Sequence, residues 1–112
     1  DMCAVCAPLK DADPDFPFTV EKRQGAPRPK PAKAGGSDHA YFAINGVPTI
    51  GFNLKDPKGY DFSYGEIWHT ERDTYNKSIP EYQEHTAICT AVVLYGLANL
   101  DHILSREGLY AE

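Results

Sequence analysis

The sequence predicts an α/β fold in which helices cover a small sheet. Residues 47–54 form an apolar run rich in strand-forming side chains, which is typical of a buried strand. Residues 78–106 carry apolar side chains at the spacing of an amphipathic helix. The expected order of strand, short helix, buried strand, loop and long helix is that of a layered α/β domain.

The N-terminal third predicts little regular structure. Residues 1–9 are small and apolar and are interpreted as the end of a helix, which the acidic, proline-containing run 11–15 breaks. Residues 16–22 predict a short strand, and Pro17 places it at a sheet edge or a strand start. Residues 24–36 are rich in Pro, Gly and Lys, so we expect a surface loop there.

A short helix is expected over residues 38–44. Ser37 offers an oxygen that can cap the helix, and Asp38 places negative charge in the first turn. The Asn45-Gly46 pair then ends the helix, since both residue types tolerate the left-handed backbone of a helix end.

The apolar strand 47–54 needs neighbours on both sides to be buried. Only one other candidate strand is present, so we expect the missing neighbours to lie in absent sequence or in another copy of the chain. The following segment, 55–67, is a long loop that contains Tyr60, Phe62 and Tyr64. Loops of this length in compact domains are often binding elements.

The long helix is predicted to start at Ser78 with a capping box, in which Glu81 is the reciprocal partner and Pro80 fits the first turn. It is expected to run to about Arg106, before Gly108. The apolar positions that predict it are Ile79, Tyr82, Ile88, Val92, Tyr95, Leu100 and Ile103 or Leu104.

Composition limits the possible partners. The 112 residues suffice for one domain, and the net charge of -5 provides no basic field for nucleic acid. No apolar run is long enough to span a membrane. Cys3, Cys6 and Cys89 cannot all pair within one chain, so at least one is free. The Cys3/Cys6 spacing also occurs in redox and zinc sites, but no second pair follows, which favours two small side chains on a helix end.

Candidate chemistry lies in two polar segments. His69 follows the long loop and is of the ligand type that zinc enzymes use, and Asp73 could orient its imidazole. Taken alone, a histidine in such a loop is more often an ordinary surface residue. Asp38 could relay a proton or hold a substrate amine, or it could simply favour the helix start. We expect His85 and His102, placed in the long helix, to be packing or surface residues.

Taken together, these segments resemble the closing part of the co-catalytic zinc aminopeptidase family, which also includes glutamate carboxypeptidases and glutaminyl cyclases. The resemblance covers roughly residues 35–104. It rests on Gly36, Ser37, Asp38, His39, Phe42, Gly46, Val47, Pro48, Trp68, His69, Thr70, Asp73 and Thr74.

The resemblance implies roles for individual residues. It implies that His69 binds one zinc ion, that Asp38 is a catalytic carboxylate at the pocket and that Asp73 supports the ligand. His39 and Tyr64 are implied to contact substrate. The family site holds two zinc ions, and its other ligands precede the segment present here, so we expect zinc occupancy in this chain to be incomplete.

The resemblance also implies a whole-protein function. It predicts that residues 1–112 are a single domain, the C-terminal segment of a three-layer α/β peptidase domain, with a linker and strand region at 1–34 and the motifs at 35–112. The full protein would remove N-terminal residues from peptides, and the segment alone would be inactive. A glutaminyl cyclase-like acyltransferase and a non-catalytic, self-associating binding domain remain alternatives. We expect a homo-oligomer if the segment is stable alone, and a periplasmic or secreted bacterial protein.

Overall fold

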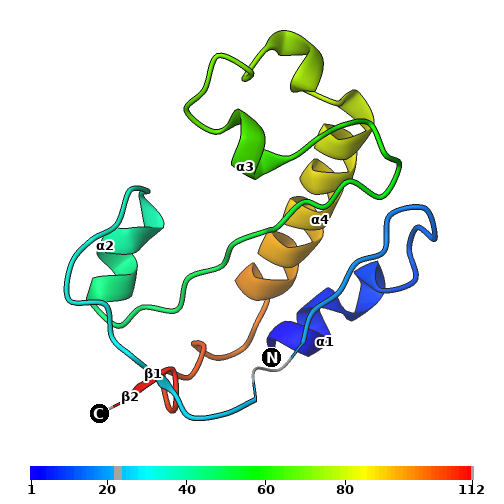
Figure 1. Cartoon of the computed structure of the whole chain (residues 1–112). Helices are drawn as coiled ribbons and strands as arrows, with labels where there is room; N and C mark the ends of the chain where they lie inside the picture. The colour runs from blue at the N-terminus through cyan, green and yellow to red at the C-terminus, as the bar shows by residue number, and fades with distance from the viewer. Residues whose placement is uncertain (22–23, 112) are drawn as a thin grey trace. The chain divides into compact units, whose positions relative to one another are not determined.

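The computed structural model describes residues 1–21 and 24–111, which divide into two compact units (Figure 1). The first, here called the helical unit, joins residues 1–21 with 52–100. The second, here called the strand unit, contains the described residues of 24–51 and 101–111.

The helical unit is built on two helices. The short helix α1, Met2–Cys6, runs into a 3-10 turn, η1, Ala7–Leu9, and both pack on the long helix α4, Pro80–Ala98 (Figure 1). The predicted N-terminal helix end is therefore confirmed. The core between them consists of four side chains that are at most 4 % exposed, namely Cys6, Leu9, Cys89 and Val93.

Gly96 allows α1 to approach α4 closely. A Cβ atom at this position would lie 2.5 Å from Cγ1 of Val5 and 3.3 Å from its Cβ. Atoms essentially never come this near without a shift of one side chain or helix. Glycine in a helix interior is otherwise unfavourable, so its presence in α4 is explained by this contact.

The predicted start of the long helix is wrong by one to two residues. Ile79 is the N-cap, Pro80 occupies the first turn, and no side chain caps the helix. The hydroxyl of Ser78 instead accepts a hydrogen bond from the side-chain amide of Gln83. Because Ile79 rather than Ser78 occupies the N-cap position, the capping box with Glu81 does not form.

The predicted end of this helix at Arg106 is also wrong, because α4 ends at Ala98. Asn99 donates two hydrogen bonds to the carbonyl of Tyr95, from its backbone N–H at 3.1 Å and from its side-chain amide at 2.8 Å. An asparagine that bonds to its own preceding turn competes with helix continuation. Residues 101–106 consequently form a bend and an irregular segment, and His102 lies outside the helix.

The buried face of α4 differs from the predicted one. Tyr82, Cys89 and Val93 are buried, whereas Ile88 and Tyr95 from the predicted set are 51 % and 74 % exposed. Apolar side chains lie all around this helix, so their spacing alone cannot show which of them contact α1.

The strand unit contains helix α2, His39–Ile44, as predicted. Its N-cap is Asp38 rather than Ser37, and no side chain caps it. Asn45-Gly46 ends the helix as expected: Gly46 has a φ of 72°, its N–H donates to Ala43, and the N–H of Val47 donates to Phe42. This pair of bonds satisfies the last carbonyls of the helix.

Two very short strands pair in the same unit. Strand β1, Arg28–Pro29, lies parallel to β2, Tyr110–Ala111, with Arg28 opposite Tyr110. Apart from β1, the described residues of 24–36 form the expected irregular loop. The chain is thus a mixed α/β protein, in agreement with the predicted class.

The two longer predicted strands do not form. Residues 16–21 are irregular, and Lys22, which the prediction included, lies outside the described residues. Residues 47–54 are also irregular, and Ile50 and Phe52 are each 42 % exposed. Both predictions are wrong for the described chain because a strand requires a hydrogen-bonded neighbour, and none lies beside either segment in the part that the structure describes.

The predicted loop 55–67 is not a loop throughout, since its last four residues form helix α3, Tyr64–Ile67 (Figure 1). A second 3-10 turn, η2, Tyr75–Lys77, follows shortly before α4. Within the described ranges, no helix combines the length and the hydropathy needed to cross a bilayer.

Candidate functional site

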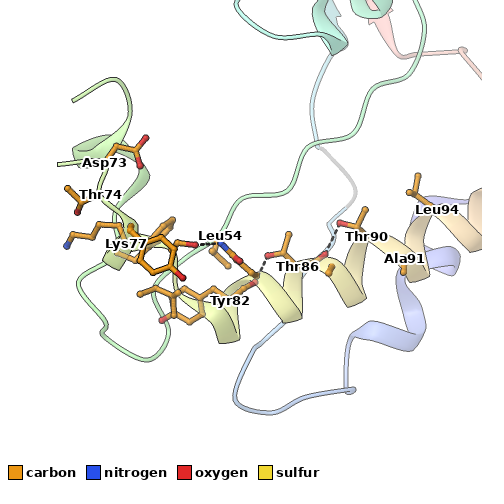
Figure 2. Close-up of a pocket in the computed structure, with 15 residues that line it drawn as sticks. Leu54, Asp73, Thr74, Lys77, Tyr82, Thr86, Thr90, Ala91 and Leu94 are labelled. Atoms are coloured by element: carbon orange, nitrogen blue, oxygen red, sulfur yellow. Dashed lines mark hydrogen bonds between the residues drawn. The ribbon is translucent and has the colours of Figure 1, made fainter. Parts of the chain in front are cut away.

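An open groove of about 930 Å³ runs along one face of α4 in the helical unit (Figure 2). One wall is α4 itself, and the other is the segment 73–79 together with Leu54 and Phe62. Figure 2 shows Thr86, Thr90 and Ala91 following one another along the helix at the groove.

Small side chains line the helix side of this groove. The hydroxyls of Thr86 and Thr90 each donate at 2.7 Å to the carbonyl four positions earlier, so both are already hydrogen-bonded. Ala87 and Ala91, each one position after a threonine, also line the groove, as does Leu94, which is 60 % exposed. The groove therefore presents mainly apolar surface, which suits an apolar partner better than an anion.

Asp56 organises the segment that leads to α3. Its carboxylate accepts the N–H of Tyr60 at 2.9 Å, the N–H of Phe62 at 3.2 Å and the hydroxyl of Tyr82. The Tyr82 hydroxyl in turn accepts the N–H of Lys58 at 3.1 Å. These hydrogen bonds lower the pKa of the Asp56 carboxyl, and the bond from Tyr82 has the largest effect. Burial raises the pKa of Tyr82.

Lys77 joins the two ends of the segment 61–77 by contacting Asp61. Its ammonium lies 2.6 Å from the carbonyl oxygen of Asp61 and 2.8 Å from the Asp61 carboxylate. Asp61 has a φ of 56°, a conformation that is uncommon for a residue with a side chain. The segment between these two residues contains α3 and three of the predicted site residues.

His69, the predicted metal ligand, follows α3 directly. Its φ is 57°, its side chain is exposed, and its ring centroid lies 4.4 Å from that of Trp68. Trp68 stacks on Tyr64 at 6.1 Å. The structure therefore brings Tyr64, the predicted substrate contact, into one aromatic row with Trp68 and His69.

Thr70 holds the turn after His69. Its hydroxyl lies 2.9 Å from the carbonyls of both Glu66 and Ile67, and its own carbonyl accepts the N–H of Asp73 at 3.2 Å. Asp73 lies at the groove (Figure 2). In the described part of the chain, no hydrogen bond joins its carboxylate to His69, so its predicted support of the ligand stays a prediction.

Asp38 and His39 lie in the strand unit, where α2 begins. Both are exposed, and the Asp38 side chain makes no cap hydrogen bond, although Asp38 occupies the N-cap position. Capping therefore does not occupy this carboxylate. Asp38 and His39 belong to the strand unit, whereas Tyr64, His69 and Asp73 belong to the helical unit. The predicted roles of all five residues stay predictions.

Two thiols are buried in the core, and a histidine packs beside one of them. Cys6, Cys89 and also the exposed Cys3 are free, which agrees with the prediction of at least one free thiol. Burial raises the pKa of Cys6 and Cys89, so both stay protonated and poorly reactive. His85 stacks on Phe16 at 4.9 Å and lies 3.4 Å from the Cys89 sulfur, in agreement with its expected packing role.

The described residues do not assemble a metal centre. Among them, no three His, Cys, Asp or Glu side chains gather in a way that could hold an ion. His69 supplies one imidazole, whereas catalytic zinc sites usually have three protein ligands. A two-zinc centre therefore does not fit the residues described.

Asp56, Lys77 and Tyr82 were not among the predicted site residues. A local signal existed for the first of them: Asp56, Pro57 and Gly59 occupy the preferred positions of a type I turn. The N–H of Gly59 indeed donates to the Asp56 carbonyl at 3.3 Å. The contact to Tyr82 has no such signal, because it lies 26 positions along the chain.

Comparison with known proteins places this chain among the peptidases. The family model described as Peptidase family M28 matches residues 16–93, and the chain belongs to that family. The predicted resemblance to zinc-dependent aminopeptidase-type metallopeptidases is thereby confirmed, and a peptidase-type function is supported at the level of the family. No similar protein was found among curated proteins, and none among solved structures.

Proposed function

We propose that this chain is the C-terminal segment of a zinc-dependent aminopeptidase, which hydrolyses N-terminal residues from peptides. The observation that carries the proposal is the Trp68-His69-Thr70 segment, which lies inside the stretch that matches the peptidase family. In the turn after α3 the imidazole of His69 is exposed, and imidazole is a common zinc ligand.

The proposal gives each predicted residue a role. His69 is one zinc ligand, and Asp73, from the same turn, supports it. Asp38 contributes a carboxylate that its helix does not use for capping. His39 and Tyr64 contact the substrate, and the Tyr64 ring, which is 62 % exposed, offers an apolar surface to a peptide side chain.

We propose that these residues act within a three-layer α/β sandwich of the zinc exopeptidase type. The match of residues 16–93 to the peptidase family supports this proposal. Since the described residues supply too few ligands for two zinc ions, the isolated segment is inactive under this proposal.

Metal content tests the assignment of His69. The purified chain is dialysed against trace zinc, and bound zinc is counted by mass spectrometry, together with His69→Ala and, as a matched control, His102→Ala. His102 lies outside the residues that match the family. Zinc that is lost in His69→Ala and kept in His102→Ala supports the assignment. Zinc that is retained without His69 contradicts it.

A glutaminyl cyclase-like acyltransferase is the second candidate. The Trp68-His69-Thr70 triplet favours it, and the continuation Asp73-Thr74-Tyr75 opposes it. The two activities act on different peptides: an aminopeptidase releases any accepted N-terminal residue, whereas a cyclase converts only an N-terminal glutamine into a ring. Assaying the longer protein with one glutamine-initiated peptide and one leucine-initiated peptide separates them.

A non-catalytic, self-associating domain is the third candidate. In the helical unit, Phe52 and Leu54 are 42 % and 37 % exposed, and the groove beside Leu54 is apolar. Such surfaces usually find a partner, so we propose that the isolated chain forms a homo-oligomer. Sedimentation equilibrium across a wide concentration range tests this, and a well-folded monomer at high concentration contradicts it.

The compartment is proposed from family resemblance alone. We propose an exported bacterial protein, periplasmic or secreted. Fractionation of the source cells, with immunodetection of this chain, tests the proposal.

A further inference from the structure

We propose that Asp56 and Lys77 are positioning residues that close the segment 61–77 into one fixed loop and so hold His69 in place. The inference rests on the proposed role of His69 as a metal ligand. It concerns the helical unit only, where both residues lie. Neither residue touches a reacting group in this proposal, since each acts through the backbone that it holds.

The first anchor is the Asp56 carboxylate. It collects three donors, the N–H groups of Tyr60 and Phe62 and the hydroxyl of Tyr82. Tyr82 belongs to α4 and is 1 % exposed, so it is fixed by the packing around it. The turn that leads into α3 is thereby attached to the long helix α4.

The second anchor is the contact from Lys77 to Asp61. These residues lie sixteen positions apart, and the ammonium reaches both the backbone carbonyl and the carboxylate of Asp61. A loop whose two ends are joined in this way is a compact closed loop, a form that often carries function. Only 19 % of the Lys77 side chain is exposed, although 87 % of the Asp61 side chain is.

The backbone inside this loop requires such anchors. Asp61 and His69 both have a positive φ, which side chains disfavour, so neighbouring contacts must hold them there. Thr70 supplies the contacts on one side of His69 through its bonds to Glu66 and Ile67. The bond from Lys77 to Asp61 is the corresponding contact at the loop entrance.

The position of His69 can be observed directly. Trp68 is the single tryptophan of the chain, and its ring lies 4.4 Å from that of His69. A fixed loop keeps the ring protons of His69 in the ring-current field of Trp68, which shifts their NMR signals. A loop that opens brings these signals toward the values of an unstructured peptide and exposes more of Trp68, which is 57 % exposed at present.

The test compares Asp56→Asn and Lys77→Met with Lys58→Met. Asp56→Asn keeps the shape and replaces one acceptor oxygen by an amide donor. Lys58→Met is the matched control, since Lys58 forms a similar ion pair with Asp15 at 2.9 Å that does not close the loop. The readouts are the His69 ring-proton shifts and the quenching of Trp68 fluorescence by acrylamide.

Both loop variants are expected to bring the His69 signals toward peptide values. They should also raise the acrylamide quenching constant of Trp68 about 1.5-fold, because the ring is already 57 % exposed and can become at most fully exposed. The control should match the unmodified chain in both readouts. Unchanged His69 signals in both loop variants would overturn the proposal, as would equal changes in the control.

Zinc content on the same samples separates this proposal from the proposed function. If the His69 signals move in the loop variants but the unmodified chain binds no zinc that depends on His69, the loop anchors are supported and the ligand role fails. If zinc depends on His69 but the signals do not move, the ligand role stands and the anchors fail.

Discussion

Replacing Gly96 by alanine is expected to destabilise the chain, although alanine is the better helix former. The new Cβ atom would lie 2.5 Å from Cγ1 of Val5, so α1 must move away from α4 or Val5 must change its conformation. Overpacking of this kind costs about 1–3 kcal/mol. The gain in helix propensity offsets about 1 kcal/mol of this cost.

The net loss for Gly96→Ala is therefore about 1 kcal/mol, which corresponds to a fall in Tm of roughly 4–8 °C. Thermal and urea unfolding followed by circular dichroism measure it. Gly65→Ala is the matched control, because Gly65 also lies in a helix, and a Cβ there meets nothing within 4 Å. This control should leave Tm unchanged or raise it.

A double variant identifies the cause of the loss. In a Val5→Ala background the contact is removed, so Gly96→Ala should become neutral or stabilising there. If Gly96→Ala raises Tm in the unmodified chain, or if it costs the same with and without Val5, the close approach of α1 and α4 is refuted.

Two further predictions concern titration and thiol reactivity. The pKa of Asp56 is lowered, chiefly by the Tyr82 hydrogen bond, so its contribution to stability is present above the ordinary value of 3.8 and is lost as the pH falls through the lowered pKa. The pKa of Tyr82 is raised from 10.0 by burial, so its contribution is present below that value and is lost as the pH rises through the raised pKa. Tm measured against pH should therefore fall at both ends, and Asp56→Asn should flatten the acid side; an unchanged acid side in this variant contradicts the assignment. With a thiol reagent at neutral pH, the exposed Cys3 should react quickly, whereas the buried Cys6 and Cys89 should react only after denaturant is added. Three thiols that react at one rate in the native chain would contradict the described core.

Local elements were predicted well where one residue type sets the backbone. Helix α2 ends at Asn45-Gly46 as expected, because Gly46 adopts the positive φ that the helix end requires. The strand predicted over 47–54 did not form, although its composition favours a strand. Strand formers need a neighbouring backbone, and no local preference supplies one.

The long helix shows the same limit. Its existence followed from apolar spacing, but its end at Ala98 depends on Asn99, whose side chain bonds back to Tyr95. Asparagine does not stop every helix, so this end could not be chosen from spacing alone. The buried face depends on which side chains meet α1, and at Gly96 an added Cβ would lie 2.5 Å from Cγ1 of Val5.

By itself, the sequence determined the family of this protein, the short helix α2 and the existence of the long helix α4. The residues that mark the family lie in short segments, and a helix depends on neighbours within a turn, so both can be recognised along the chain. Only the tertiary structure decided which side chains are buried, which thiols are protected and how the His69 segment is held. Those features depend on contacts such as Lys77 to Asp61 and Tyr82 to Asp56, which join residues 16 and 26 positions apart. Contacts at that separation form only when the folded chain brings their partners together, because local preferences do not extend so far along the sequence.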